Sequence, residues 1–134
     1  MTGQKDRYST TEKLWNLDDE QLTTPKHDEL VLMLSNKDYS KSKFDIIDVE
    51  TIDYEVPLKT CSGFIVGYWD VVINKSSYHA LFIECKPYVD SFGKVMRQIN
   101  TYKEYTNGYK IYLFTPDIRF KEAFESQGIK VISP

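Results

Sequence analysis

The stretch "YWDVVINKSSYHALFIECK", residues 68–86, constrains the fold more than any other part of the chain. It reads as two apolar strands around a polar turn, yet Asp70, Glu84 and Lys86 lie inside those strands. Ionisable side chains seldom occupy apolar strands without a partner or a function. The segments "WDVVI" and "LFIECK" around the turn are apolar on both faces, which is typical of interior strands. The stretch therefore predicts a central hairpin that carries charge into a sheet.

The spacing of the charges predicts how they meet. Asp70 and Glu84 are equally distant from Ser77, so a loop over residues 75–79 would place them opposite each other, with Cβ atoms about 4.5–5.5 Å apart. Two carboxylates that close repel unless a positive charge lies between them. Mg²⁺ prefers such oxygen ligands. Lys86 shares the face of Glu84 because strand side chains alternate, and it could hold a phosphate or orient a water. The alternative is a cross-strand salt bridge on a solvated face.

The elements predicted around this hairpin are those of an α/β domain. They are a helix over 25–35, strands over 44–56, 64–73 and 78–86, a helix over 91–105, a strand over 110–115, a helix from 115–117 to 128, and a strand over 129–132. Residues 36–42 are expected to form a polar loop. A three-strand meander followed by crossovers predicts a mixed sheet with helices on its faces. Residues 1–24 are expected to be an N-terminal extension with a possible short helix, and 25–134 the folded domain.

Composition excludes several classes of protein. The 134 residues correspond to one domain, and 41% hydrophobic with 28% charged residues is typical of a globular protein. The apolar runs are too short to span a bilayer, and the polar N-terminus does not resemble a secretory signal. With Cys61 and Cys85 as the only cysteines, neither a disulfide scaffold nor a cysteine zinc site is expected. A cytoplasmic location without a membrane partner is the expectation.

Charge distribution leaves room for a polyanionic partner. The formal net charge is −3. Between Lys86 and Lys110, however, the chain carries Lys86, Lys94, Arg97, Lys103 and Lys110 against Asp90 and Glu104, a local surplus of three positive charges (5 − 2). A basic patch beside an acidic site is therefore compatible with the sequence.

Three segments together, "GYWDVVI", "LFIECKP" and "GKVMRQINTYKEY", resemble the PD-(D/E)XK nuclease superfamily. The third segment resembles the Q-x-x-x-Y motif through Gln98 and Tyr102. That motif marks the branch that contains the nuclease domains of bacterial recombination helicase–nucleases, phage lambda exonuclease and CRISPR-associated adaptation nucleases. The resemblance implies a restriction-endonuclease-like α-β-β-β-α-β core over residues 25–115. The proline of the superfamily motif is Trp69 here.

The resemblance also implies roles for individual residues. Asp70, Glu84 and the Cys85 backbone carbonyl would bind the metal, and Lys86 would be the catalytic lysine. Gln98 and Tyr102 would brace the site and contact the DNA backbone. A further acidic ligand usually comes from the first helix, where Glu29 is our choice and His27 and Asp28 are alternatives. Lys94 and Arg97, beside Gln98, would engage the DNA strand.

The function expected from these residues is a Mg²⁺- or Mn²⁺-dependent deoxyribonuclease. It would hydrolyse DNA phosphodiester bonds during replication, recombination or repair, and a homodimer or higher oligomer is possible. One alternative is a structure-selective endonuclease of the Holliday-junction type, which would act as a dimer. Another is a nucleic-acid-binding module that kept the fold without catalysis.

Overall fold

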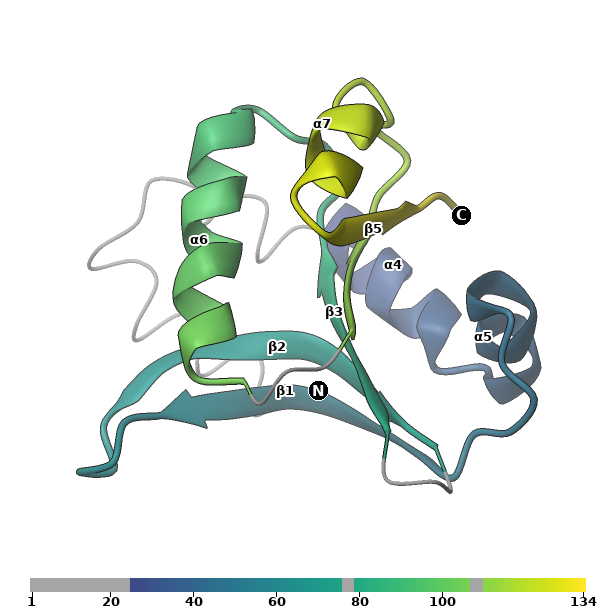
Figure 1. The fold of residues 1–134 in the computed structure, drawn as a ribbon. Helices are drawn as coiled ribbons and strands as arrows, with labels where there is room; N and C mark the ends of the chain where they lie inside the picture. The colour runs from purple at the N-terminus through teal and green to yellow at the C-terminus, as the bar shows by residue number, and fades with distance from the viewer. Residues whose placement is uncertain (1–24, 76–78, 107–109) are drawn as a thin grey trace.

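The computed structural model describes residues 25–75, 79–106 and 110–134, which form an α/β domain (Figure 1). The first part of the domain is helical, then a meander follows, and helices and strands alternate to the end. The elements are α4 (Pro25–Leu34), α5 (Lys37–Phe44), β1 (Thr51–Lys59), β2 (Ile65–Asn74), β3 (Ala80–Cys85), α6 (Phe92–Glu104), β4 (Lys110–Phe114), α7 (Lys121–Ser126) and β5 (Ile129–Ile132). No helix of the described ranges is long and apolar enough to cross a bilayer.

The five strands form one mixed sheet in the order β1-β2-β3-β4-β5. β1, β2 and β3 pair antiparallel, whereas β3, β4 and β5 pair parallel. The α6 crossover makes the β3–β4 pair possible, because parallel neighbours cannot be joined by a tight turn. The prediction of a mixed sheet flanked by helices is confirmed.

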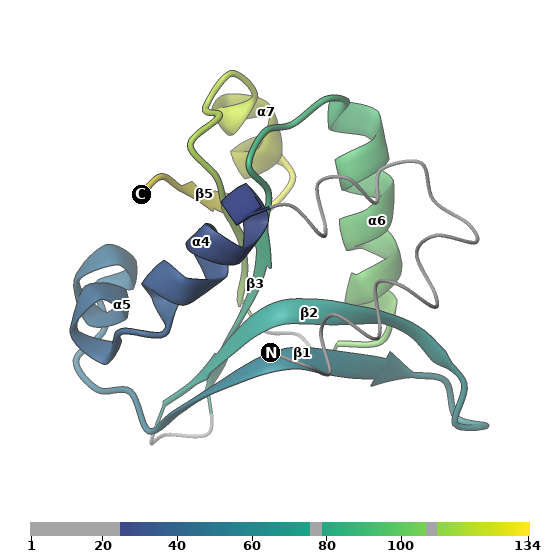
Figure 2. The ribbon, with the colours of Figure 1, turned by 180° about the vertical axis from the view of Figure 1, so that it is seen from behind.

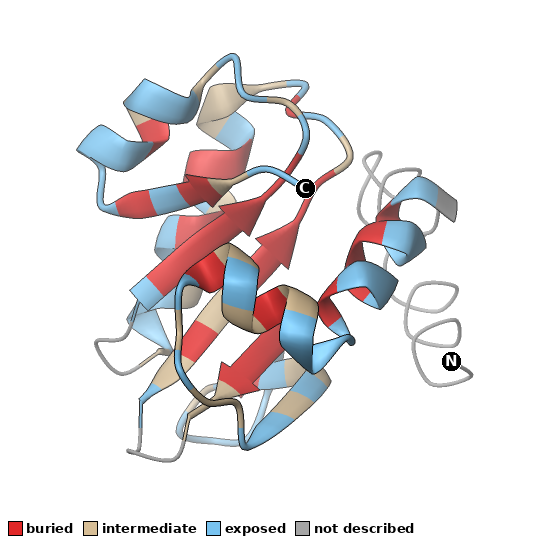
Figure 3. Cartoon of the chain, turned by 90° about the vertical axis from the view of Figure 1, so that its right-hand side faces the viewer, coloured by how far each residue is buried: buried red, intermediate tan, exposed pale blue. Residues whose placement is uncertain are grey.

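Helices cover both faces of the sheet (Figures 1 and 2). α6 and α7 pack on one face, and α4 and α5 pack on the other, so the central strands are buried on both sides, as Figure 3 shows in red. The core under α6 and α7 contains Trp69, Val72, Ile99, Leu113 and Phe124, among others. The core under α4 and α5 contains Leu34, Phe44, Ile73, Ile83 and Phe114, among others.

Residues 36–42 do not form the predicted loop. Most of them belong to α5, whose N-cap is Asn36: its side-chain oxygen accepts the Tyr39 N–H at 3.0 Å. Asp45 ends the helix in the left-handed region, at φ 52°. The helix has little apolar sequence of its own, and it is stabilised by the cap and by burial of Phe44 against the sheet.

Two further boundaries differ from the prediction. The first strand covers Thr51–Lys59 rather than 44–56, because α5 and its cap use residues 37–45. The last helix is shorter, Lys121–Ser126, because Thr115 and Asp117 form a side-chain-capped turn before it: the Asp117 N–H donates to Thr115 Oγ1 at 3.0 Å. The predicted extension over residues 1–24 lies outside the described residues.

Candidate active site

Asp70 and Glu84 meet on neighbouring strands. β2 and β3 pair through Val71↔Ile83, and the same register continued by one residue places Asp70 opposite Glu84. The two side chains are only 3% and 1% exposed, and Glu84 is among the groups that act on the Asp70 carboxylate. The close pair expected from the spacing is therefore present, and it lies inside the domain rather than on a solvated face.

At Asp70, the alternation of β2 side chains between the two faces of the sheet is interrupted. Val71 and Ile73 of β2 pack in the core under α4, whereas Trp69 packs in the core under α6, although alternation would put all three on one face. β1 switches in the same row: Glu55, which falls opposite Asp70, has φ 49°. This inversion in both strands puts Asp70 where side chains from α4 and from β3 both reach it.

The Asp70 carboxylate is held from two sides. Its Oδ2 accepts the backbone N–H of Cys85 at 2.8 Å, and its Oδ1 lies 3.3 Å from His27 Nε2. Burial acts to raise the pKa of Asp70, but the charge and hydrogen bond of His27, with the contacts to Glu84 and Cys85, outweigh it and lower that pKa. Asp70 is thus an ionised carboxylate at neutral pH.

His27, not Glu29, is the α4 side chain that reaches the pair. His27 is completely buried, whereas Glu29 and Asp28 are exposed; His27 Nδ1 lies 3.6 Å from Asp28 Oδ1. Burial acts to lower the pKa of His27, but the Asp70 carboxylate and then Asp28 raise it overall. The structure does not bring Glu29 to the carboxylate pair and places the alternative residue there instead.

A signal for His27 exists in the sequence. His27 precedes Leu30, Val31 and Leu34 by three, four and seven residues, which is the spacing of one helix face. Those three leucine and valine side chains are buried against the sheet. Glu29 is out of phase with them, so the helical period favours His27 as the inward-facing residue.

Glu84 is held by the predicted motif of α6. Gln98 Nε2 donates to Glu84 Oε2 at 2.7 Å and to the Tyr102 hydroxyl at 3.3 Å. Since Gln98 and Tyr102 are four residues apart, they lie on one helix face, and that face looks toward β3. The Q-x-x-x-Y residues therefore brace the second carboxylate.

Tyr102 is itself fixed in place. Its ring packs edge-on against Trp69 at a centroid distance of 5.2 Å and lies directly over Gly67. Thr106 links the two aromatic residues, because its hydroxyl accepts from Trp69 Nε1 and donates to the Tyr102 carbonyl. Burial and then the charge of Glu84 raise the pKa of Tyr102, so the phenol stays neutral and acts as a hydrogen-bonding group.

Lys86 follows β3 at the edge of this pair. Its backbone N–H donates to the Phe114 carbonyl at 3.1 Å, and its side chain is buried. Among the residues that the structure describes, no carboxylate forms an ion pair with the Lys86 ammonium. Burial raises the pKa of the adjacent Cys85 thiol well above its ordinary value, with Asp70 and Glu84 adding to the shift, so Cys85 contributes its backbone rather than a thiolate.

The remaining predicted residues lie at the surface. Lys94 and Arg97 are exposed on α6, one turn apart and next to Gln98 in the chain. Because both side chains are exposed on the helix that holds Glu84, a large ligand could reach them.

One contact near the site has no clear signal in the sequence. Arg119 Nη2 donates to the Val89 carbonyl at 2.8 Å and to Asp117 Oδ2 at 2.7 Å, and Asp117 Oδ2 accepts the Val89 N–H at 2.9 Å. The hydrogen bond from Arg119 lowers the pKa of Asp117. This clamp fixes the connection between Lys86 and α6, but an aspartate two residues before an arginine is too common a pattern to predict it.

The donor set fits a divalent cation with few protein ligands. Within the described ranges, no group of three or more His, Cys, Asp or Glu side chains is already arranged as a metal site. Mg²⁺ and similar ions are often held by one or two carboxylates with waters and substrate phosphates. Two donors at neighbouring positions of an octahedral ion lie about 3 Å apart. The separation of His27 Nε2 and Asp70 Oδ1, 3.3 Å, is close to that spacing.

No family model, curated protein or solved structure matches this chain. The resemblance to PD-(D/E)XK nucleases therefore stays a prediction from the motifs. Any functional assignment depends on the contacts of Asp70, Glu84, Lys86 and their partners.

Proposed function

We propose that this chain is a divalent-metal-dependent nuclease with a restriction-endonuclease-like fold, and that it hydrolyses DNA phosphodiester bonds. The observation that carries the proposal is the buried Asp70–Glu84 pair, which faces across β2 and β3 beside the buried Lys86. Burying two acids on facing strand positions costs free energy, so such a pair is better explained by a function that needs both than by stability.

Each residue has a role in this proposal. Asp70, Glu84 and His27 would hold the cation, which supplies a more acidic water and offsets charge on the phosphate. Lys86 would donate to a phosphate oxygen or to the attacking water, because it lies two residues after Glu84 and so close to the carboxylate pair. Gln98 fixes the orientation of Glu84 through the 2.7 Å hydrogen bond. Because these groups are set before substrate binds, little reorganisation is needed during the reaction.

The imidazole bears on the choice of metal. Carboxylates and water suit Mg²⁺ and Mn²⁺ alike, whereas imidazole nitrogen is a poorer ligand for Mg²⁺ than for transition metals. His27 Nε2 is the atom that faces Asp70 Oδ1. We therefore propose Mn²⁺ as the better activator, with Mg²⁺ as the weaker one.

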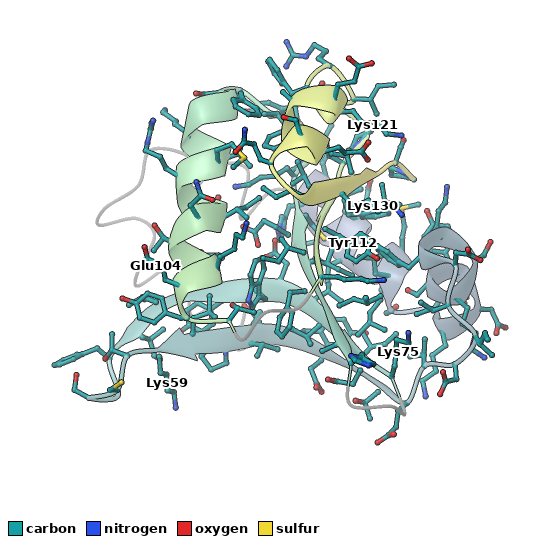
Figure 4. The ribbon with its side chains drawn as sticks, viewed as in Figure 1. Lys59, Lys75, Glu104, Tyr112, Lys121 and Lys130 are labelled. Carbon is teal, nitrogen blue, oxygen red and sulfur yellow. The ribbon has the colours of Figure 1, made fainter. Side chains whose placement is uncertain are left out.

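A substrate panel with a lysine variant tests this function. Single-stranded, double-stranded, flapped, hairpin and four-way-junction DNAs are each incubated with Mg²⁺, Mn²⁺ or chelator. Lys86→Ala should keep the fold and lower cleavage by at least about 10²-fold, since it removes a positioned donor. Lys121→Ala, an exposed lysine on α7 (Figure 4), is the matched control and should cleave like the parent. Equal cleavage by Lys86→Ala and the parent in Mn²⁺ would contradict the proposal.

A further inference from the structure

The end of the β1–β2 hairpin projects from the domain. The ribbon tip, Lys59–Ile65, extends past α6 in both views of the fold (Figures 1 and 2). Phe64 is 74% exposed there, and its neighbour Ile65 is 49% exposed. Further back, Leu58 is buried under α6 and Gly67 lies under Tyr102. Among the described residues, the tip is therefore the part of the hairpin that no helix covers, and it carries an exposed aromatic side chain.

The ribbon tip is ordered by its own hydrogen bonds. The Thr60 N–H donates to the Phe64 carbonyl at 2.8 Å, and the Gly63 N–H donates to the Thr60 carbonyl at 2.9 Å. The Phe64 N–H donates to Thr60 Oγ1 at 3.1 Å. Gly63 supplies the left-handed conformation of the turn, at φ 92°. Phe64 is thus presented in a fixed position, which lowers the entropy lost when it binds.

The charge of the hairpin end is complementary to a polyanion. Residues 56–69 contain no acidic residue and one lysine, Lys59, although the chain carries 20 acidic residues among 134. Lys59 lies on the end of the ribbon that projects, opposite the end marked by Lys75 (Figure 4). An exposed aromatic residue, a lysine and no carboxylate favour a nucleic-acid partner over a second copy of this acidic chain.

We propose that the ribbon tip enters a groove of duplex DNA bound at the active site and that Phe64 inserts between two base pairs. Apolar wedges of this kind partially unstack a base step and bend the duplex. Phe64 directly precedes β2 and is six residues before Asp70 in the chain, so it lies at most about 20 Å away at about 3.3 Å per residue. At about 3.4 Å per base pair, the wedge contacts the duplex at most about six base pairs from the bond that is cut. The proposal rests on the proposed function for the position of the DNA.

The test measures binding without cleavage. A duplex that carries the fluorescent base analogue aminopurine is titrated with the protein in chelator, and both anisotropy and aminopurine fluorescence are recorded. Binding of the parent should raise the fluorescence, because an unstacked base is brighter. Phe64→Ala should weaken binding at least about fivefold, the effect of losing one aromatic–base contact, and should abolish the rise. Phe64→Leu, which keeps an apolar wedge, should retain most of the binding and most of the fluorescence rise.

A matched control separates the wedge from general surface effects. Leu32 is 70% exposed on α4, away from the ribbon, so Leu32→Ala should change neither signal. Thermal unfolding of Phe64→Ala should match the parent, because the side chain is exposed. Equal binding by Phe64→Ala and the parent would overturn the proposal. Failure of the parent to bind duplex DNA would overturn it too. So would a Phe64→Ala variant whose only change is the loss of a dimer. Binding with unstacking but no cleavage in metal would refute the nuclease function and leave the wedge in place.

Discussion

The packing of Tyr102 on Gly67 gives a prediction whose size follows from the structure. A Cβ added at Gly67 would lie 2.6 Å from Cζ and 2.7 Å from the hydroxyl oxygen of Tyr102. The ring cannot swing away freely, because Trp69 packs against it and Gln98 donates to its hydroxyl. Gly67→Ala should therefore lower the free energy of unfolding by about 1–3 kcal/mol, the usual cost of overpacking.

A double-mutant cycle measures that clash directly. In a Tyr102→Ala background, Gly67→Ala should cost less than about 0.5 kcal/mol, so the coupling free energy from urea unfolding should be at least about 0.5 kcal/mol. Gly93→Ala is the control: it lies in α6, where its Cβ would meet the flexible end of Arg97 and make an ordinary contact with Ser91 Oγ, and it should stabilise by up to about 1 kcal/mol. Additive effects of Gly67→Ala and Tyr102→Ala would refute the reasoning.

Two other predictions concern a helix cap and a buried charge pair. Asp45 ends α5 at φ 52°, so Asp45→Gly should raise the free energy of unfolding by about 0.5–1 kcal/mol in urea, and a loss would contradict the strain argument. In metal-free protein, the pKa of His27 is raised by Asp70. This pair should therefore stabilise fully below the unfolded pKa of about 6.5, and the contribution should fade as the pH rises through the folded value. The depressed pKa of Asp70 adds stability above about pH 3.9 that is lost as the pH falls. Unfolding across pH should show both trends in the parent. Asp70→Asn should remove the Asp70 trend and reduce the His27 trend, because Asp28 still raises the pKa of His27; an unchanged profile in that variant would contradict the pairing.

The hairpin could be predicted because its determinants are local. The equal distance of Asp70 and Glu84 from the turn sets the register, and β2 and β3 pair accordingly. Gln98 and Tyr102 could also be predicted as a pair, because a spacing of four residues puts them on one helix face whatever the rest of the fold.

Features that depend on distant contacts could not be predicted in the same way. α5 has few apolar residues, and it forms because Phe44 packs against Tyr112 and Phe114 of β4, more than sixty residues later. The resemblance implies an acidic ligand from the first helix and so favours Glu29, although the helical period points His27 inward. The interrupted alternation of side chains at Asp70 accompanies a positive φ at Glu55. A glutamate gives no signal of that conformation in a sequence.

Cleavage by a Glu84 variant tests the central claim most directly. Glu84→Gln, which keeps the shape of the side chain and removes its charge, should lower the single-turnover cleavage rate of DNA in Mn²⁺ by at least about 10²-fold. Glu29→Gln, which changes an exposed carboxyl group on α4, should cleave at the parent rate. A Glu84→Gln protein that is folded and cleaves as fast as the parent would show that the buried carboxylate pair is not the active site.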